Sequence, residues 1–291
     1  MSGLPSGYTQ LEYIESSGTQ YTDTGFVPSP DTRAVVDAQI TAQTAASVAY
    51  LGERSGSGSS DKTAFALWSM STGANVSSDF FGNRVSKSMS TIGTRVLIDK
   101  NKSSVTINDS TITNSAAAGT AKRPIFLLAL NDKGTAAYGI AAKLYACQLY
   151  DNGTLVRDFI PCKNASGAVG LYDAVEGQFY ANAGTGSFTA GPEIIPDPPA
   201  APTGLQTVLA VVLQWAASAN ADRYDVYRDG AKLGSTETTQ YVDITPEANQ
   251  TYVYTVKAVN GGGESAGTFI TVYTKSGYFE YKPLIESANF R

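Results

Sequence analysis

The residues best suited to chemistry near the start of the chain are three carboxylates set among aromatic side chains. Glu12, Glu15 and Asp23 lie in the stretch LEYIESSGTQYTDTGF, residues 11–26, which also holds two tyrosines and a phenylalanine. Acids beside aromatics are typical of clefts that bind or cleave sugars, and retaining hydrolysis needs two carboxylates about 5–5.5 Å apart. Residues three apart on a strand point to opposite faces, so Glu12 and Glu15 do not form such a pair. We interpret these acids as solvent-facing or turn residues.

A second pair of acids has the same unfavourable spacing. Asp173 and Glu176 lie three residues apart in YDAVEGQFY. The chain also has no histidine, which removes the commonest general base and the serine and cysteine triads that depend on it. We therefore expect that the chain is not an enzyme, and a glycoside hydrolase is the least favoured of the alternatives.

The two cysteines are expected to be free thiols. A two-residue turn at Asn152-Gly153 would pair the flanking segments as a hairpin and set Cys147 opposite Asp158. Cys162 would then lie about 13 Å away along the strands. A disulfide needs Cα atoms within about 7 Å of each other. We therefore predict that both cysteines are buried core residues. They give no evidence about the redox compartment.

Four aromatic residues are candidates for sugar binding because they lie in or near predicted loops: Trp68, Phe80, Phe81 and Tyr138. An exposed aromatic ring can stack on the face of a sugar, but aromatic residues are more often buried in a core. Trp68 lies in AFALWSM, where the alternation does not decide which face it occupies. Both interpretations stay open for each of the four.

The composition excludes several partners. A net charge of −5 gives no basic surface for nucleic acid. No run approaches eighteen apolar residues, so we expect no membrane insertion. The first ten residues, MSGLPSGYTQ, lack the basic and apolar regions of a secretory signal.

The elements that must position these residues are strands. Short β-branched and aromatic runs alternate with Gly, Asn, Asp and Ser clusters, and strong helical periodicity is missing, which predicts an all-β fold. The expected strands are 33–42, 47–51, 64–69, 95–100, 104–108, 125–130, 143–150 and 155–161. Eight or more strands without repeats indicate an antiparallel two-sheet sandwich or jelly roll.

The chain is expected to have four parts. Residues 1–190 form the first β domain, and residues 191–201, inside GPEIIPDPPAAP, form a Pro-rich linker that should be extended. A smaller β domain spans 202–274. The last part, 275–291, is a C-terminal tail with no obvious place in that domain.

The second domain resembles a fibronectin type III module, an immunoglobulin-like sandwich. The resemblance rests on Val-x-Leu-x-Trp ending at Trp215, on YDVYRDGAKLG, on YVDITPEANQTYVYTVKAVN and on the loop GGGES. It implies that Trp215 is the buried core tryptophan and that Tyr252 is the corner tyrosine. Modules of this family are mostly spacers or binding platforms.

The first domain resembles the concanavalin A-like lectin/glucanase superfamily in its laminin G-like branch. The residues that carry this are TRVLIDKNKSSVTINDSTIT, PIFLLALND and GIAAKLYACQLYDNGTLVRDFIPC. The glucanases of this superfamily have an acid-x-acid-x-acid pattern, which this chain lacks. Many laminin G-like domains bind calcium, but Tyr145 stands where relatives often have an acid. Asp132 alone in LNDKG is a usual turn former, so we predict no cofactor and keep calcium as the alternative.

A further resemblance is to a module of structural proteins of phages and prophages of Gram-positive gut bacteria. It rests on LPSGYTQLEYIESSGTQYTDTGF and LVRDFIPCKNASGAVGLYDAVEGQFYANAGTGSFTAG. It implies a virion protein, tail-associated or decorating the capsid, that is made without a signal peptide and exposed after lysis. The expected partners are other virion proteins, further copies of the chain, and host-surface or mucus glycans bound through many weak sites. A secreted bacterial carbohydrate-binding adhesin is the alternative.

The tail is a candidate docking segment. An apolar, aromatic segment after a finished domain often docks on a partner, although it can also pack on its own domain. The residues expected to dock are Tyr278, Phe279, Tyr281, Leu284, Ile285 and Phe290.

Overall fold

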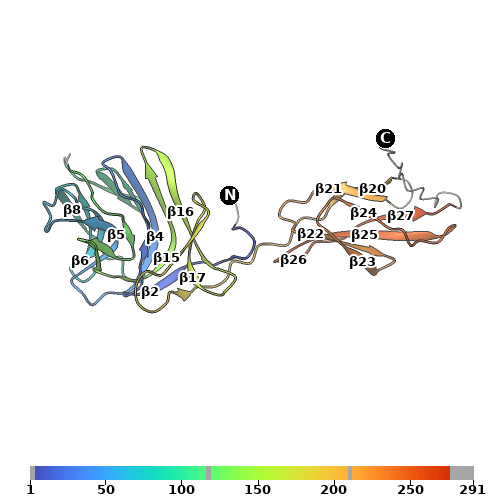
Figure 1. Ribbon diagram of the computed structural model, residues 1–291, viewed down its shortest axis with the longest axis horizontal. Coiled ribbons are helices and arrows are strands. Elements are labelled where there is room, and N and C mark those ends of the chain that lie inside the picture. The colour runs from blue at the N-terminus through green and yellow to red at the C-terminus, as the bar shows by residue number, and fades with distance from the viewer. Residues whose placement is uncertain (1–3, 116–118, 209–211, 276–291) are drawn as a thin grey trace, which may run out of the picture. The chain divides into compact units, whose positions relative to one another are not determined.

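The computed structural model describes residues 4–115, 119–208 and 212–275, and these contain strands and turns but no helix. The chain divides into two compact units, with the boundary between Ile194 and Ile195 (Figure 1). In both units two sheets of mainly antiparallel strands enclose a hydrophobic core. The predicted fold class, a jelly-roll sandwich followed by a smaller immunoglobulin-like sandwich, is confirmed. No helix in the described residues is long and apolar enough to cross a membrane.

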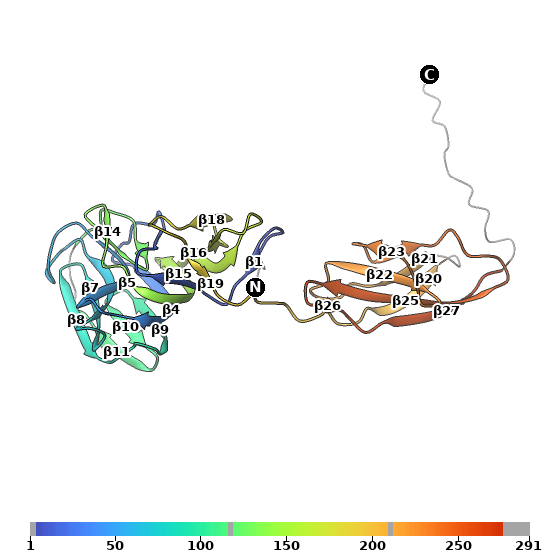
Figure 2. The same ribbon diagram turned by 90° about the horizontal axis from the view of Figure 1, so that it is seen from below.

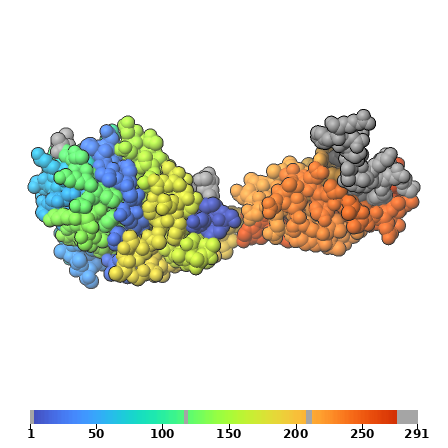
Figure 3. Space-filling view, in the orientation of Figure 1, coloured from blue at the N-terminus to red at the C-terminus, as the bar shows by residue number. Residues whose placement is uncertain are grey.

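The larger sheet of the first unit has the order β11-β10-β9-β4-β15-β16-β17-β18, with β1, β2 and β19 paired beside this path. Its strands are β1 (Thr9–Gln10), β2 (Ile14–Ser17), β4 (Thr32–Ala42), β9 (Arg95–Asn101), β10 (Ser104–Ile107), β11 (Ser110–Thr113), β15 (Ala141–Asp151), β16 (Thr154–Lys163), β17 (Val169–Asp173), β18 (Gln178–Ala181) and β19 (Thr189–Ala190). The longest strands, β4 and β15, form the centre. Figure 3 shows the N-terminal residues (blue) against later strands of the same unit (yellow), as the β1–β16 and β2–β19 pairs require.

The second sheet of the first unit has the order β14-β13-β5-β6-β7-β8, with β3 and β12 beside this path (Figure 2). Its strands are β3 (Thr22–Asp23), β5 (Ser47–Arg54), β6 (Phe65–Met70), β7 (Asn75–Phe80), β8 (Asn83–Ser88), β12 (Phe126–Leu127), β13 (Leu130–Asp132) and β14 (Thr135–Ala137). One pair in it, β5 with β13, is parallel.

The core of the first unit lies between the two sheets. Strand β4 shows why: from Thr32 to Ile40 its residues alternate buried and half-buried, and the buried ones are Thr32, Ala34, Val36, Ala38 and Ile40. One face of each sheet is thus apolar, as a sandwich requires. Phe80 and Phe81, expected at a possible sugar site, belong to this core and are at most 5% exposed.

The cysteine hairpin forms as predicted at its turn but shifts by one residue further along. Asp151 pairs with Thr154, and a bulge between Leu149 and Tyr150 then moves the register. Cys147 therefore lies opposite Phe159, where the unbulged hairpin had placed Asp158. Both cysteines are buried free thiols, and burial raises the pKa of the Cys147 thiol far above its usual value.

The first residues of the expected linker pair with the first unit. Glu193 forms a bridge with Leu11, and the backbone N–H of Ile194 donates to the Gln10 carbonyl at 2.9 Å. These bonds explain why the boundary between the units follows Ile194.

The second unit packs a three-stranded sheet, order β20-β21-β24, on a five-stranded sheet, order β23-β22-β25-β26 with β27 on β25. The strands are β20 (Thr203–Val208), β21 (Val212–Ala216), β22 (Arg223–Arg228), β23 (Ala231–Thr236), β24 (Gln240–Val242), β25 (Thr251–Asn260), β26 (Gly263–Glu264) and β27 (Thr268–Tyr273). Trp215 is a buried core residue, as predicted. The Tyr252 hydroxyl accepts a bond of 3.0 Å from the Glu247 backbone N–H, as expected of a corner tyrosine. The six tail residues expected to dock lie outside the described residues.

Candidate functional site

The first unit has a hollow of about 390 Å³ at Tyr138. Three segments far apart in the sequence form most of it: the turn after β2, the end of β14, and the loop after β18, with Ala129 added from between β12 and β13. The lining residues are Gly18, Thr19, Gln20, Tyr21, Ala129, Ala136, Ala137, Tyr138, Gly139, Gly184 and Thr185. The lining contains two tyrosines, neutral polar groups and small residues, and no charged side chain.

Two glycines allow these three segments to approach one another. A Cβ atom on Gly139 would lie 2.1 Å from the backbone oxygen of Gly18, and one on Gly184 would lie 2.1 Å from that of Thr19. Such contacts are far inside van der Waals distance, so any larger residue would push the segments apart. Glycine at both places lets three loops form one continuous surface.

Tyr21 forms one side of the hollow and is fixed from behind. Its backbone N–H donates to the Asn182 side-chain oxygen at 3.1 Å, and its ring stacks on Phe126 with 4.7 Å between centroids. Asn182 also accepts from the Gly184 N–H at 2.8 Å. One asparagine therefore ties the loop after β18 to the segment that carries Tyr21.

Tyr138 has an unusual backbone conformation. Its φ of 55° lies in the left-handed region, which is strained for a bulky residue. The backbone is held by a bond of 2.8 Å from the Ala49 N–H to the Tyr138 carbonyl oxygen. The residue as a whole is 39% exposed. Strain of this kind persists only where the surrounding structure maintains it.

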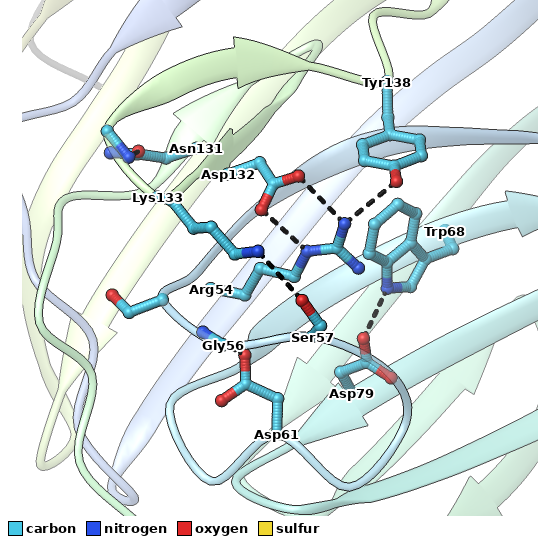
Figure 4. A network of polar contacts seen from close by, with 12 residues as sticks. Arg54, Gly56, Ser57, Asp61, Trp68, Asp79, Asn131, Asp132, Lys133 and Tyr138 are labelled. Atoms are coloured by element: carbon cyan, nitrogen blue, oxygen red, sulfur yellow. Dashed lines mark hydrogen bonds and ion pairs between the residues drawn. The ribbon is translucent and has the colours of Figure 1, made fainter.

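Arg54 lies under Tyr138 and holds its ring in place (Figure 4). Arg54 donates to the Tyr138 hydroxyl at 2.9 Å and makes a bidentate pair with Asp132 at 2.9 and 3.0 Å. The pair forms because Arg54 and Asp132 are partners in the parallel β5–β13 pairing. The hydrogen bond with Asp132 raises the pKa of Arg54, and the same bond lowers the pKa of Asp132.

Trp68 lies beneath this layer and is 1% exposed. Its ring meets the Tyr138 ring edge-on at 5.2 Å, and the Arg54 guanidinium is 5.7 Å from its centroid. Its indole N–H donates to Asp79 at 2.8 Å, and Arg84 pairs with the same carboxylate. The rings and charges thus form a rigid base for Tyr138, in which each arginine satisfies an acid and contacts a ring.

The structure places the four predicted aromatic residues in different roles. Tyr138 lines the hollow. Trp68 is buried beneath Tyr138 and does not line the hollow itself. Phe80 and Phe81 are core residues and offer no face to a ligand, which corrects our expectation for them, because their rings fill the space between the sheets. The sequence did not indicate Tyr21 as a member of the site, although Tyr21 lies in the acidic and aromatic stretch of residues 11–26.

The acids that the sequence singled out lie in different surroundings. Glu12 and Asp23 are exposed. Asp173 and Glu176 both contact Arg157, at 3.5 and 2.7 Å, so their carboxylates are held by one cation. No group of three or more His, Cys, Asp or Glu side chains able to hold a metal occurs there, and the Asp132 carboxylate is already bound to Arg54.

Comparison with known proteins gives partial similarities. No protein-family model matches the chain. A poly(3-hydroxybutyrate) depolymerase of Ralstonia pickettii is 40% identical over 102 residues, covering 33% of this chain and 19% of that protein. An alpha-amylase of Niallia circulans is 33% identical over 125 residues, covering 34% of this chain and 10% of that protein. The chain thus spans less than a fifth of the length of either relative.

Among solved structures, domains LG4-5 of the mouse laminin alpha1 chain are similar at a TM-score of 0.36. The identity is 11%, and the similarity covers 96% of this chain and 70% of that one.

Proposed function

We propose that the chain is a non-enzymatic glycan-binding protein and that the hollow at Tyr138 is its site. The observation that carries the proposal is the chemistry of the lining, two tyrosines among threonine, glutamine and small residues with no charge. Neutral sugars present apolar ring faces that pack on aromatic rings and hydroxyls that bond neutral polar groups. The strained and braced Tyr138 supports the choice of this surface.

The absence of a paired-acid geometry near the hollow supports binding without hydrolysis. None of its lining residues is an acid, whereas hydrolysis of a glycosidic bond needs two carboxyl groups at the bond. Partial relatives include a chitinase of Paenibacillus xylanexedens and the alpha-amylase, whose names denote polysaccharide-degrading enzymes. We propose that the similarity reflects ancillary modules of those enzymes.

Removal of Tyr138 is expected to weaken glycan binding at this site. Tyr138→Ala deletes the ring and also relaxes Arg54, so affinity for a glycan selected on an array should fall at least tenfold, which corresponds to about 1.4 kcal/mol. Calorimetry on the full chain checks this, with Tyr273→Ala as the control because Tyr273 is an exposed tyrosine of the second unit. Equal affinity of the Tyr138 variant and the wild type would refute the site. Release of reducing sugar that a single Glu or Asp substitution abolishes would refute the non-enzymatic assignment.

We further propose that the chain is a structural protein of a phage particle, tail-associated or decorating the capsid. The phage-like segments at both ends of the first domain support this, together with two all-β units of binding type. Many copies on one particle would together bind firmly through individually weak glycan contacts, because linked sites bind with a high effective concentration. A secreted bacterial adhesin is the alternative.

Labelling of purified particles separates these origins. An antibody against the chain should decorate virions in electron micrographs at regular positions on the tail or capsid. Detection of the chain on the surface of uninfected cells, with none on particles, would favour the adhesin.

We propose that residues 276–291 dock on a partner protein of the particle. The six apolar and aromatic residues of this segment support the proposal. Deletion of 276–291 should lower incorporation into particles while the glycan affinity stays unchanged. Normal incorporation of the shortened chain would exclude docking by this segment.

A further inference from the structure

The hairpin of β13 and β14, which leads directly into Tyr138, leaves one backbone edge open. In the part of the chain that the structure describes, β14 pairs only with β13. The two turn residues, 133–134, both have positive φ. The pair that flanks such a two-residue turn is hydrogen-bonded across the hairpin, so the next pair, Asn131 with Ala136, is not. The backbone N–H and C=O of Ala136 therefore point away from β13.

The pairing of β13 with β5 supports the same orientation. The backbone N–H of Lys133 donates to the Arg54 carbonyl at 2.9 Å. Backbone groups change side at each residue of a strand, so those of Asn131, two residues earlier, also point towards β5. The backbone groups of Asn131 are thus turned away from Ala136. An edge with such unpaired groups is ready to bond another amide.

The open edge belongs to the hollow at Tyr138, since Ala136 and Ala137 both line it. Ala137 is the direct partner of Leu130, and Leu130 packs with Trp68, the ring beneath Tyr138. Directly paired residues place their side chains on the same face of a sheet. The methyl group of Ala137 therefore lies on the face that carries Tyr138, next to the open edge.

The hollow has few polar groups left for a ligand. The side-chain oxygen of Gln20 accepts from the Ser17 N–H at 2.8 Å, and its nitrogen donates to the Thr185 carbonyl at 3.2 Å. The Tyr138 hydroxyl accepts from Arg54 and keeps its own proton for a ligand. Six of the eleven lining residues are glycine or alanine: Gly18, Ala129, Ala136, Ala137, Gly139 and Gly184. A ligand that offered only hydroxyls to this part would lose water without gaining partners.

We propose that the hollow at Tyr138 selects N-acetylated hexosamines, with the acetamido group placed against the open edge of β14. The carbonyl of this group accepts from the Ala136 N–H, its methyl packs on Ala137, and the sugar ring packs on Tyr138. A neutral hexose lacks the methyl, and an acidic sugar would meet no positive charge among the lining residues. The inference rests on the proposed function, because it names the class of glycan for the same site.

A peptide strand suits the same edge less well. Addition of a peptide to a sheet uses repeated main-chain bonds along the edge. Strand β14 has three residues, and only Ala136 among them points its backbone groups outward. One outward N–H suits a single amide carbonyl, such as that of an acetamido group.

Two matched pairs of sugars test the selectivity of the full chain by calorimetry. They are chitohexaose with cellohexaose, and methyl N-acetyl-α-galactosaminide with methyl α-galactoside. Within each pair an acetamido group replaces a hydroxyl. We expect the N-acetylated member of at least one pair to bind about tenfold more tightly. Equal affinities in both pairs, or no binding of either N-acetylated sugar at millimolar concentration, would overturn the inference. Equal affinities that fall in the Tyr138→Ala variant would overturn it while the proposed function stands.

A proline substitution tests the open edge itself. Ala136→Pro removes the outward N–H but no bond between β13 and β14, because proline is tolerated where a strand N–H faces out. The variant should lose the preference for the N-acetylated sugar and keep the wild-type unfolding midpoint in urea. The control is Thr111→Pro, since Thr111 holds the equivalent position after the two-residue turn 108–109 in the edge strand β11. A preference retained by Ala136→Pro would refute the role of the edge. The comparison of sugars on the wild-type chain stands even if a variant fails to fold.

Discussion

The Lys100→Met variant is expected to be more stable than the wild-type chain at pH 6, by on the order of 2–4 kcal/mol. Lys100 is fully buried, with its ammonium 2.8 Å from the Ser78 hydroxyl and 4.4 Å from the Phe65 ring centroid. Burial lowers the pKa of Lys100 from 10.5 to about 7, against the opposing influence of Asp79. Below pH 7 the folded chain must therefore keep a charge in its core, whereas methionine fills the same space without one.

The advantage of methionine should disappear in alkaline solution. Between pH 7 and 10.5 the lysine is neutral in the folded chain and charged in the unfolded chain. The wild type then gains about 1.4 kcal/mol of stability for each pH unit, until both states are neutral. Urea unfolding, followed by Trp68 fluorescence in a Trp215→Phe background, measures this in the first unit. Lys102→Met is the control, because Lys102 lies in the same hairpin and is half exposed. A difference independent of pH would contradict a charged Lys100 in the core.

The Glu53→Gln variant is expected to show the opposite dependence on pH. Glu53 is fully buried, one of its oxygens has no hydrogen-bond partner within the described residues, and burial raises the pKa of Glu53 from 4.5 to about 8. Below pH 4.5 the carboxyl is neutral in both states, so the variant should match the wild type within about 1 kcal/mol. As pH rises to 8, the unfolded wild type loses its proton first and the wild type loses stability. At pH 8 the free energy of unfolding of the variant should exceed that of the wild type by on the order of 2–4 kcal/mol.

The same unfolding measurement tests Glu53, with Glu12→Gln as the control for an exposed acid. Equal pH profiles of Glu53→Gln and the wild type between pH 4.5 and 8 would show that Glu53 is ionised in the folded chain. Since Glu53 acts between pH 4.5 and 8 and Lys100 between pH 7 and 10.5, the wild-type stability should fall towards pH 7, stay level to pH 8 where the two effects oppose each other, and recover in more alkaline solution.

Strands with alternating apolar residues were predictable from the sequence, and polar ones were not. The expected strands at 33–42 and 143–150 correspond to β4 and β15, whose inward positions are aliphatic. Strand β8, with the sequence NRVSKS, has no fully buried residue. In strand β7 the polar residues Ser77 and Ser78 are both buried. Neither pattern separates a strand from a loop. The expected strand at 125–130 is interrupted because Leu128 adopts a φ of 65°.

The candidate site was only partly predictable. Tyr138 was indicated by its place near a loop, but the hollow also needs Gly18, Tyr21 and Gly184 from distant segments. Their meeting depends on glycine contacts that no local pattern specifies. The side on which Trp68 lies was undecided in AFALWSM. The structure decides it, since Trp68 packs with Ala66, Ala49 and Leu130 on the face turned away from the main core.

The pairing of β2 with β19 and of Leu11 with Glu193 has a consequence for synthesis on the ribosome. The first unit cannot complete its larger sheet until residues near 190 have emerged from the ribosome, because β2 and Leu11 pair with β19 and Glu193. Its central pair, β4 with β15, also joins segments separated by about a hundred residues. Long-range pairing of this kind folds slowly and leaves strand edges exposed meanwhile. During translation the edges of the nascent first unit therefore stay unpaired until its last strands have emerged.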